Sequence, residues 1–402
     1  MECKWSQAPL GELISYISKG IVPKYTDDIV GSTIVLGQRC VRNQRVDYTQ
    51  ARFHDQKTKP FKPEKTVVLG DILINATGVG SAGRVAQVTV SPQQNCVTDG
   101  HVITLRAKGI NPFYLGYFLK SRQSMIEQMA EGSTGQTEMD RSRLQNEIVV
   151  TFPQDNAAQT AIAQFGLSVD RKIAINNQIN GYLAELLDAK FDKLLEDVDG
   201  WSEASLLDIA NYKNGLAMQK FRPKAGDLGL PVLKIRELGQ GHCGLDSERC
   251  QSDIDEAVLV HDGDLVFSWS GTLLLEFWAG GDAGLNQHLF KVTSAAYPSW
   301  FYYMWTKRHL RKFVAMAKDR ATTMGHIKRS ALADSKVLIP ERLALDELTK
   351  SMQPLVEQMI LNKVENRQLN NLRDVLLPKL MSGEIDVSKV NLTQLNSHLS
   401  GC

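Results

Sequence analysis

The sequence predicts an α+β protein, with two similar β-rich globular domains separated by two long helices that pair as an antiparallel coiled coil. Three observations predict this class. One order of short strands, loops and an aromatic helix occurs twice in the 402 residues, and each copy closes on a strand that ends in proline. Each copy is followed by roughly forty residues with apolar side chains every three or four positions, the spacing of a helix with one buried face.

The internal repeat preserves the order of its parts. Residues 5–16 recur as residues 201–212, and a Gly-Asp pair before an apolar strand occurs at Gly70 and again at Gly263. This order predicts a domain duplication, and pseudo-twofold symmetry if the two helices run antiparallel. Further matched segments are Thr33–Leu36 with Pro231–Lys234, Asp99–Ile103 with Asn286–Phe290, and the helix starts at Pro112 and Pro298.

The domain boundaries follow from this order. We expect globular domains at residues 1–153 and 200–340, helical spacers at 154–199 and 341–386, and a C-terminal tail at 387–402. Polar residues on the apolar stripe, at Asn176, Asn362 and Asn366, can set the register of the helix pair. The stripe itself is expected to contain Ile162, Val169, Ile179, Leu183 and Leu186 in the first helix, and Leu355, Met359, Leu369, Leu372 and Leu376 in the second.

The composition limits the class of protein. Hydrophobic residues make up 43% and charged residues 23%, as in soluble globular proteins. No membrane-spanning or signal segment is evident, so we expect a cytoplasmic protein. The six cysteines lack metal-ligand spacing, which predicts reduced thiols and no metal site. The net charge of +1 does not by itself indicate nucleic-acid binding.

Two strings are similar to enzyme motifs but have simpler explanations. Residues 78–83 match G-x-G-x-x-G, yet an alternating strand pattern follows where a cofactor site needs a helix. The string that begins Asn111-Pro112 lacks the second proline of adenine methyltransferases, and a capped helix start explains it. We read His101 and His288 as core or turn histidines. We therefore predict no intrinsic catalytic activity.

The chain resembles the specificity subunit of a type I restriction-modification system. The resemblance is carried by Gly70–Leu73, by Thr134-Gly135-Gln136-Thr137 and by Leu377–Ile385, in this order within a duplicated frame. It implies two target-recognition domains, each reading one half of a bipartite asymmetric DNA target. It also implies helices that dock two modification (methyltransferase) subunits, which restriction subunits join, and the apolar residues of the stripe named above are the candidates for this docking as well as for the coiled coil. S-adenosylmethionine, ATP and Mg are expected on those partners, and no cofactor in this chain.

Two alternatives remain open. One is a methyltransferase-like enzyme with an unusual cofactor loop. The other is a scaffold that binds proteins without reading DNA, which the balanced charge favours. The second half also departs from the family pattern, because Thr322-Thr323-Met324-Gly325 stands where the first half has Thr-Gly-Gln-Thr.

Candidate DNA contacts are polar and basic residues in the loops of both halves, since arginine, lysine and amide side chains read base edges and phosphates. In the first half they are Gln38, Arg39, Arg42, Asn43, Gln44, Arg45, Thr77, Arg84, Thr134, Gln136, Arg141 and Arg143. In the second half they are Lys234, Arg236, Ser270, Thr272, Arg320, Thr322, Thr323, His326, Lys328 and Arg329.

Overall fold

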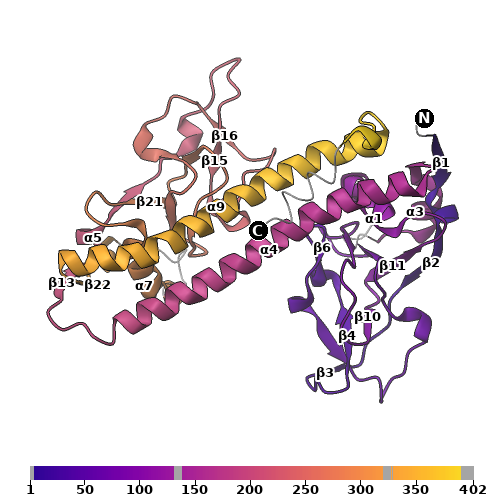
Figure 1. Cartoon of the computed structure of the whole chain (residues 1–402), viewed down its shortest axis with the longest axis horizontal. Coiled ribbons are helices and arrows are strands. Elements are labelled where there is room, and N and C mark those ends of the chain that lie inside the picture. Colours follow the sequence, from indigo (N-terminus) through magenta and orange to yellow (C-terminus); the bar gives the residue numbers. More distant parts are fainter. Residues whose placement is uncertain (1–3, 131–137, 320–326, 328, 391–402) are drawn as a thin grey trace. The chain divides into compact units, whose positions relative to one another are not determined.

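The computed structural model describes residues 4–130, 138–319, 327 and 329–390. It divides into two compact units (Figure 1). The first unit contains Met1–Arg171 and Leu372–Cys402, and the second contains Lys172–Asn371. Two long helices, α4 (Asn156–Leu194) and α9 (Arg342–Ser382), each contribute to both units.

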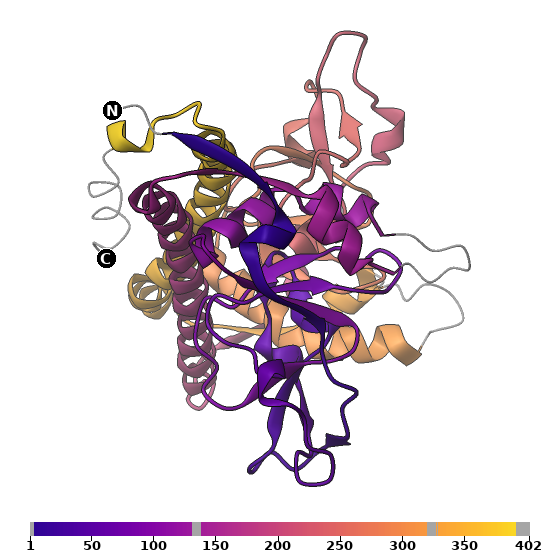
Figure 2. The same ribbon diagram turned by 90° about the vertical axis from the view of Figure 1, so that its right-hand side faces the viewer.

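The first unit has two four-stranded sheets, which lie to one side of the N-terminal part of α4 (Figure 2). One sheet is antiparallel, in the order β2-β11-β8-β9, and the other has the order β10-β4-β7-β3 with a parallel β10–β4 pair. A third, two-stranded sheet pairs β1 with β12. The strands are β1 (Trp5–Pro9), β2 (Ile14–Lys19), β3 (Tyr25–Thr26), β4 (Thr33–Leu36), β7 (Arg52–His54), β8 (Ile72–Asn75), β9 (Val85–Gln87), β10 (Cys96–Thr98), β11 (Val102–Ala107) and β12 (Val149–Pro153). The helices are α1 (Pro112–Ser121), α2 (Gln123–Gln128) and α3 (Arg141–Glu147).

The second unit repeats the antiparallel sheet, in the order β14-β21-β18-β19. Its other sheet has the order β16-β15-β20-β17, and it again contains one parallel pair, β15–β20, which here lies in the centre of the sheet. The predicted duplication is therefore confirmed, although α7 replaces the shorter α1 and α2. The strands are β13 (Ser202–Ser205), which pairs with β22 (Lys336–Ile339), β14 (Asn211–Asn214), β15 (Leu230–Leu233), β16 (Arg249–Cys250), β17 (Leu259–Val260), β18 (Leu265–Ser268), β19 (Leu275–Phe277), β20 (Ala283–Leu285) and β21 (Leu289–Thr293). The helices are α5 (Leu206–Ile209), α6 (Ile235–Gln240), α7 (Ser299–Asp319) and α8 (Arg329–Ala333).

The repeated Gly-Asp pair forms the turn that leads into a fully buried strand in each unit. Gly70 and Gly263 have φ values of 88° and 92°, a region that glycine occupies without steric cost. In the first unit, the buried Asp71 accepts a hydrogen bond from the Val68 amide at 2.9 Å and pairs with Arg106 at 2.7 Å. Asp264 makes the equivalent contacts in the second unit, so this repeated motif has a structural role.

The helices α4 and α9 run antiparallel within the second unit, as a ladder of buried amides shows. Asn176 donates to Asn366 at 3.0 Å, and Asn362 donates to Asn180 at 2.8 Å, so a later residue in α4 meets an earlier one in α9. The predicted register role of these asparagines is in agreement with these contacts. Of the predicted stripe, Ile162, Val169, Met359 and Leu369 are buried, and Leu183, Leu355, Leu372 and Leu376 are partly buried.

Two residues of the predicted stripe do not lie in the packed seam. Ile179 and Leu186 are 36% and 44% exposed. The buried face of α4 in the second unit instead contains Leu187 and Phe191, with Leu183 packed against them. Because successive helical residues point about 100° apart, burial of Leu187 turns Leu186 outward. The spacing of apolar residues in the sequence did not distinguish the buried face with Leu187 from the neighbouring exposed face with Leu186.

Candidate nucleic-acid interface

The arginine-rich segment 38–45 folds into a short helical turn and a tight hairpin in the first unit. The hairpin pairs β5 (Val41–Arg42) with β6 (Arg45–Val46). Its two turn residues, Asn43 and Gln44, have φ values of 51° and 58°, the left-handed region that two-residue hairpin turns of type I′ require. The side chain of Val41 is fully buried, so the hairpin is anchored at its base while its tip is exposed.

The predicted arginines of this segment have different environments. Arg39 and Arg42 are exposed, and within the described part of the chain neither forms an ion pair. Arg45 instead lies 3.8 Å from the carboxylate of Asp170, and the Gln44 amide donates to the Lys120 carbonyl at 3.2 Å. Arg45 and Gln44 thus fix the hairpin to the rest of the first unit, whereas the exposed Arg39 and Arg42 have no ion pair among the described residues.

Asp170 is the centre of a charged cluster in the first unit. It accepts hydrogen bonds from the Tyr117 hydroxyl at 2.7 Å and from Arg373 at 2.6 Å, and Lys120 lies 3.9 Å away. Burial alone would raise the pKa of Asp170, but Lys120 and Arg373 hold that pKa below its ordinary value. Burial also lowers the pKa of Lys120 to about 8. This cluster joins α1, α4, α9 and the hairpin.

Three of the predicted loops converge in the first unit. The Gln38 amide donates to the carbonyl and hydroxyl of Thr77 at 2.5 and 2.6 Å, which ties the arginine segment to the loop after β8. Thr77 also forms a β-bridge with Glu138, and the Met139 amide donates to the Ala76 carbonyl at 2.7 Å. Segments 38–45, 77–84 and 138–141 therefore meet at one site.

The glycine loop at residues 78–83 is a turn that leads into a strand. Gly78, Gly80 and Gly83 all have positive φ values, and the next element is strand β9. The loop thus lacks the helix N-terminus that would meet a phosphate or carboxylate. Arg84 donates to the Gly80 carbonyl at 2.7 Å, so this predicted DNA contact braces its own loop.

The polar turn that ends in α3 contributes a cation, Arg141, that has no ion pair among the residues the structure describes. Arg141 is exposed at the start of α3, where Asp140 caps the helix through the Ser142 amide. Arg143 was predicted as a DNA contact, but it binds Glu147 at 2.7 and 3.0 Å and the Met129 carbonyl at 3.1 Å. These contacts assign Arg143 a structural role.

The predicted contacts of the second unit are largely neutralised or buried. Lys234 pairs with Glu248 at 2.6 Å, and Arg236 pairs with both Glu237 and Asp246. Ser270 is only 3% exposed, so its side chain is not accessible to DNA. Thr272 and Arg329 remain exposed. The predicted residues Thr134, Gln136, Arg320, Thr322, Thr323, His326 and Lys328 lie outside the described residues.

Two exposed cations of α7 were not predicted. Within α7, Lys307 and Arg308 pair with Asp188 and Asp192 of α4, whereas Arg311 and Lys312 are exposed. No ion pair of Arg311 or Lys312 occurs among the described residues. The sequence could have indicated them, because residues 307–312 contain four lysines and arginines. The aromatic residues that precede them made this helix a candidate for the core instead.

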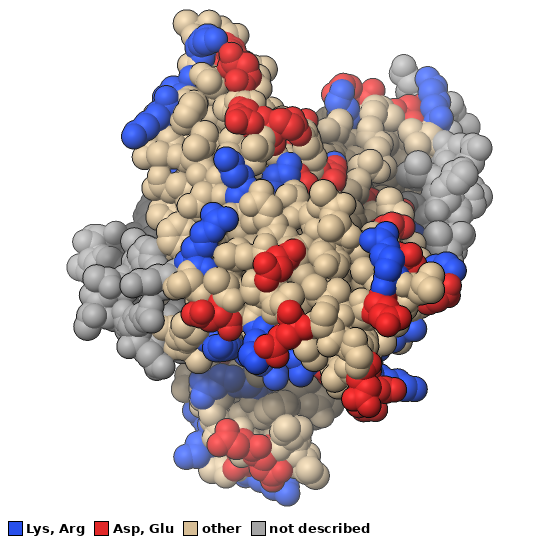
Figure 3. All heavy atoms as spheres, turned by 90° about the vertical axis from the view of Figure 1, so that its left-hand side faces the viewer, with Lys and Arg blue, Asp and Glu red and all other residues tan. Residues whose placement is uncertain are grey.

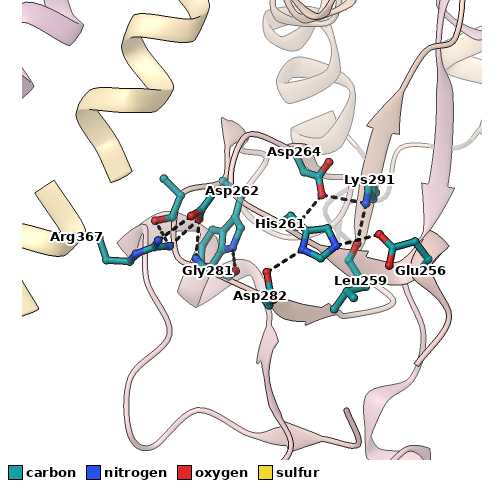
Figure 4. A network of polar contacts seen from close by, with 11 residues as sticks. Glu256, Leu259, His261, Asp262, Asp264, Gly281, Asp282, Lys291 and Arg367 are labelled. Atoms are coloured by element: carbon teal, nitrogen blue, oxygen red, sulfur yellow. Dashed lines mark hydrogen bonds and ion pairs between the residues drawn. The ribbon is translucent and has the colours of Figure 1, made fainter. Parts of the chain in front are cut away.

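Acidic residues surround the basic ones on the second unit. The face drawn in Figure 3 carries Lys and Arg next to Asp and Glu, as the balanced net charge implies. Figure 4 shows how such pairs attach α9 to the β-rich part: Arg367 makes a bidentate contact with Asp262 at 2.6 and 2.7 Å. Beside it, hydrogen bonds to Asp282 and Glu256 raise the pKa of His261.

The part of the chain that is described contains no candidate metal site and no candidate membrane-spanning helix. No group of three or more His, Cys, Asp or Glu side chains there is placed to hold a metal ion. Likewise, none of the described helices combines the length and apolar character needed to cross a membrane.

Comparisons with known proteins agree with this architecture. Residues 3–184 match the model of the type I restriction modification DNA specificity domain. The specificity subunit of the type I restriction enzyme MjaIX of Methanocaldococcus jannaschii is 24% identical over 70% of this chain and 71% of its own length. The crystal structure of a type I restriction-modification S subunit from M. genitalium has a TM-score of 0.56 at 17% identity, covering 94% of this chain and 96% of that one.

These comparisons confirm the predicted resemblance to type I restriction-modification specificity subunits. Residues 3–184 are similar to the type I restriction modification DNA specificity domain. The likeness to the solved S subunit confirms the fold class, with two sheet-rich domains and two long helices. We therefore call the β-rich part of each unit a recognition domain.

Proposed function

We propose that this chain is the DNA-recognition subunit of a type I restriction-modification complex, and that each recognition domain reads one half of a bipartite, asymmetric target. The observation that carries the proposal is the convergence of segments 38–45, 77–84 and 138–141 in the first unit. Three exposed cations, Arg39, Arg42 and Arg141, lie in these segments without an acidic partner among the described residues. Such cations can bind phosphates and base edges without first breaking an ion pair.

The chain itself is proposed to be non-catalytic. Methylation and cleavage then belong to modification and restriction subunits, with S-adenosylmethionine, ATP and Mg bound there. The glycine loop supports this division, since its backbone leads into β9 and not into a helix.

A docking surface for a modification subunit is proposed on α4 in the second unit. Four large side chains there are 36–60% exposed and recur at three-four spacing: Ile175, Ile179, Tyr182 and Leu186. A contiguous exposed apolar stripe of this kind is typical of a protein-binding surface. Of the two roles predicted for Ile179 and Leu186, docking and the coiled coil, the proposal keeps the docking of a partner.

Methylation mapping tests the proposed function. The chain is co-expressed with its modification subunits, and methylated adenines are mapped on genomic DNA. We expect one split, asymmetric sequence, with no site-specific methylation when the chain is omitted. Methylation at the same sites without this chain would contradict the proposal.

A protein-binding scaffold is the second candidate, because the near-neutral charge and the neutralised Lys234 and Arg236 favour it. The salt dependence of duplex binding separates the two functions. Phosphate contacts release counterions, so a DNA-recognition subunit must lose affinity steeply as salt rises. A scaffold would assemble with its partner subunits and bind no duplex at any salt concentration.

A further inference from the structure

A histidine with the same local surroundings occurs in each recognition domain. The Asp99 carboxylate accepts a hydrogen bond from the His101 amide at 2.9 Å, and the Asn286 side chain accepts one from the His288 amide at 3.2 Å. Each turn follows a strand of the parallel pair, β10 or β20, and precedes a strand of the antiparallel sheet, β11 or β21. The duplication has therefore preserved the turn that presents the histidine.

The surroundings of the turn are preserved as well. In each unit a glycine packs against the backbone of this turn. It is Gly20 in the first unit and Gly215 in the second. A Cβ atom on Gly20 would lie 1.9 Å from the Thr98 carbonyl oxygen, and one on Gly215 would lie 2.3 Å from that of Leu285. Only glycine permits so close an approach. The two histidines thus lie in turns with the same backbone packing, although the helices around them differ.

A hydroxyl group contacts the same ring nitrogen in both domains. The Thr77 hydroxyl lies 2.9 Å from His101 Nδ1, and the Ser270 hydroxyl lies 3.1 Å from His288 Nδ1. Each hydroxyl belongs to the loop that follows the buried strand β8 or β18. Ser270 is buried, whereas the His288 side chain that it contacts is partly exposed.

The hydrogen bonds of Thr77 in the first unit are compatible with a His101 ring that carries its hydrogen on Nε2. Gln38 Nε2 donates to the Thr77 hydroxyl at 2.6 Å, so this hydroxyl can give its own hydrogen to His101 Nδ1. Nδ1 then accepts, and the neutral ring carries its hydrogen on Nε2. The His101 side chain is exposed, and Nε2 has no hydrogen-bond partner within the described ranges. With this tautomer, an exposed residue carries an N–H donor at Nε2.

We propose that His101 and His288 each donate this Nε2–H to a phosphate oxygen of duplex DNA, with Thr77 and Ser270 as positioning residues. The inference rests on the proposed DNA-recognition function. A phosphate is the better acceptor than a base, because the motif is the same in two domains that are proposed to read different half-sites. In the second domain, the Gln287 side-chain nitrogen, itself a donor, lies 3.3 Å from His288 Nε2. The ring hydrogen must therefore move to Nε2, and Gln287 must move aside, for a phosphate to bind there.

Methylphosphonate scanning of the duplex tests the contact directly. The assembled complex with its modification subunits binds duplexes in which one phosphate at a time is replaced by a neutral methylphosphonate. For the wild type we expect a position near the first half-site where the replacement costs about tenfold in affinity. His101→Asn keeps a polar group at the Nδ1 position and removes the distal donor, so the replacement at that position should cost nothing further. His288→Asn is expected to do the same at the second half-site.

Control variants separate a DNA contact from a structural role. His261→Asn is the matched control, because both ring nitrogens of this partly exposed histidine contact carboxylates, and we expect an unchanged scan. His101→Gln, which extends an amide toward the Nε2 position, should recover part of the affinity. If His101→Asn prevents assembly, Thr77→Val supplies the same comparison by removing the positioning hydroxyl.

Three outcomes would overturn the inference or its premise. A scan that is identical for the wild type and His101→Asn would overturn the phosphate contact while leaving DNA recognition intact. A loss confined to discrimination at one base pair would replace the phosphate by a base edge. Absence of sequence-dependent binding by the wild-type complex would instead refute the proposed function.

Discussion

Arginines that are alike in the sequence have different roles at the residue scale. Arg39 and Arg42 are exposed without an acidic partner in the described ranges, whereas Arg45 contacts Asp170 and Arg143 binds Glu147. An uncompensated guanidinium can bind DNA without losing an existing contact, whereas a paired one cannot. The environment, and not the residue type, therefore decides which arginine is available.

The first prediction concerns the free arginines. Arg39→Ala and Arg42→Ala should each weaken duplex binding, and each should reduce the slope of log affinity against log salt by about 0.9 if the residue contacts a phosphate. Arg143→Ala is the matched control, which should leave this slope unchanged. Fluorescence anisotropy over a salt series measures both. Equal effects of all three variants would show that the ion pairs do not decide which of these arginines contacts DNA.

The second prediction concerns the carboxylate that anchors the hairpin. Asp170→Asn leaves Lys120 and Arg373 without their shared buried partner, so we expect the first unit to lose about 3 kcal/mol of unfolding free energy. Asp374→Asn is the control, because Asp374 also binds Arg373 but is 66% exposed, and its loss should stay within about 0.5 kcal/mol. Urea unfolding followed by circular dichroism measures the difference. Similar losses in both variants would show that Asp170 is not the centre of the cluster.

At the scale of single elements, the two long helices combine a buried seam with an exposed stripe. The periodicity in the sequence predicted both helices and the asparagines between them. It could not separate Leu187, which packs into the second unit, from Leu186, which is exposed, because the sequence does not show which side of a helix the folded domain covers. Only tertiary contacts distinguish the two faces.

The third prediction tests the amide ladder. Asn176→Leu removes one partner and leaves the buried Asn366 amide with an unmet hydrogen bond, which should cost about 1–3 kcal/mol of unfolding free energy. Adding Asn366→Leu should recover much of this loss, since two apolar side chains can pack together. Chemical unfolding of the single and double variants measures the coupling. Additive losses would contradict a direct contact.

The fourth prediction tests the exposed stripe on α4. Ile179→Asp and Leu186→Asp should abolish co-purification with the modification subunit without lowering the unfolding midpoint of the chain, because neither side chain lies in the core. Leu187→Ala provides the contrast: it should destabilise the chain by about 2–5 kcal/mol, since Leu187 is fully buried. Retained co-purification of both aspartate variants would place the docking surface elsewhere.

At the scale of the whole molecule, the chain is a duplicated frame with divergent loops. The order of strands could be predicted from the sequence because the same apolar and glycine signals occur twice. The candidate site was only partly predictable. Lys234 and Arg236 carry the right charge, but Glu248, Glu237 and Asp246 neutralise them through contacts that no local pattern reveals. Conversely, the two histidines became candidates only when their matching surroundings were compared.

Each recognition domain is proposed to read its own half of the target, and a domain exchange can separate the two halves. Residues 1–153 are replaced by the corresponding segment of a subunit with a different target, and adenine methylation is mapped on genomic DNA in the presence of the modification subunits. We predict a new split sequence in which one half-site changes and the other stays the same. A change in both half-sites, or an unchanged target, would contradict the account.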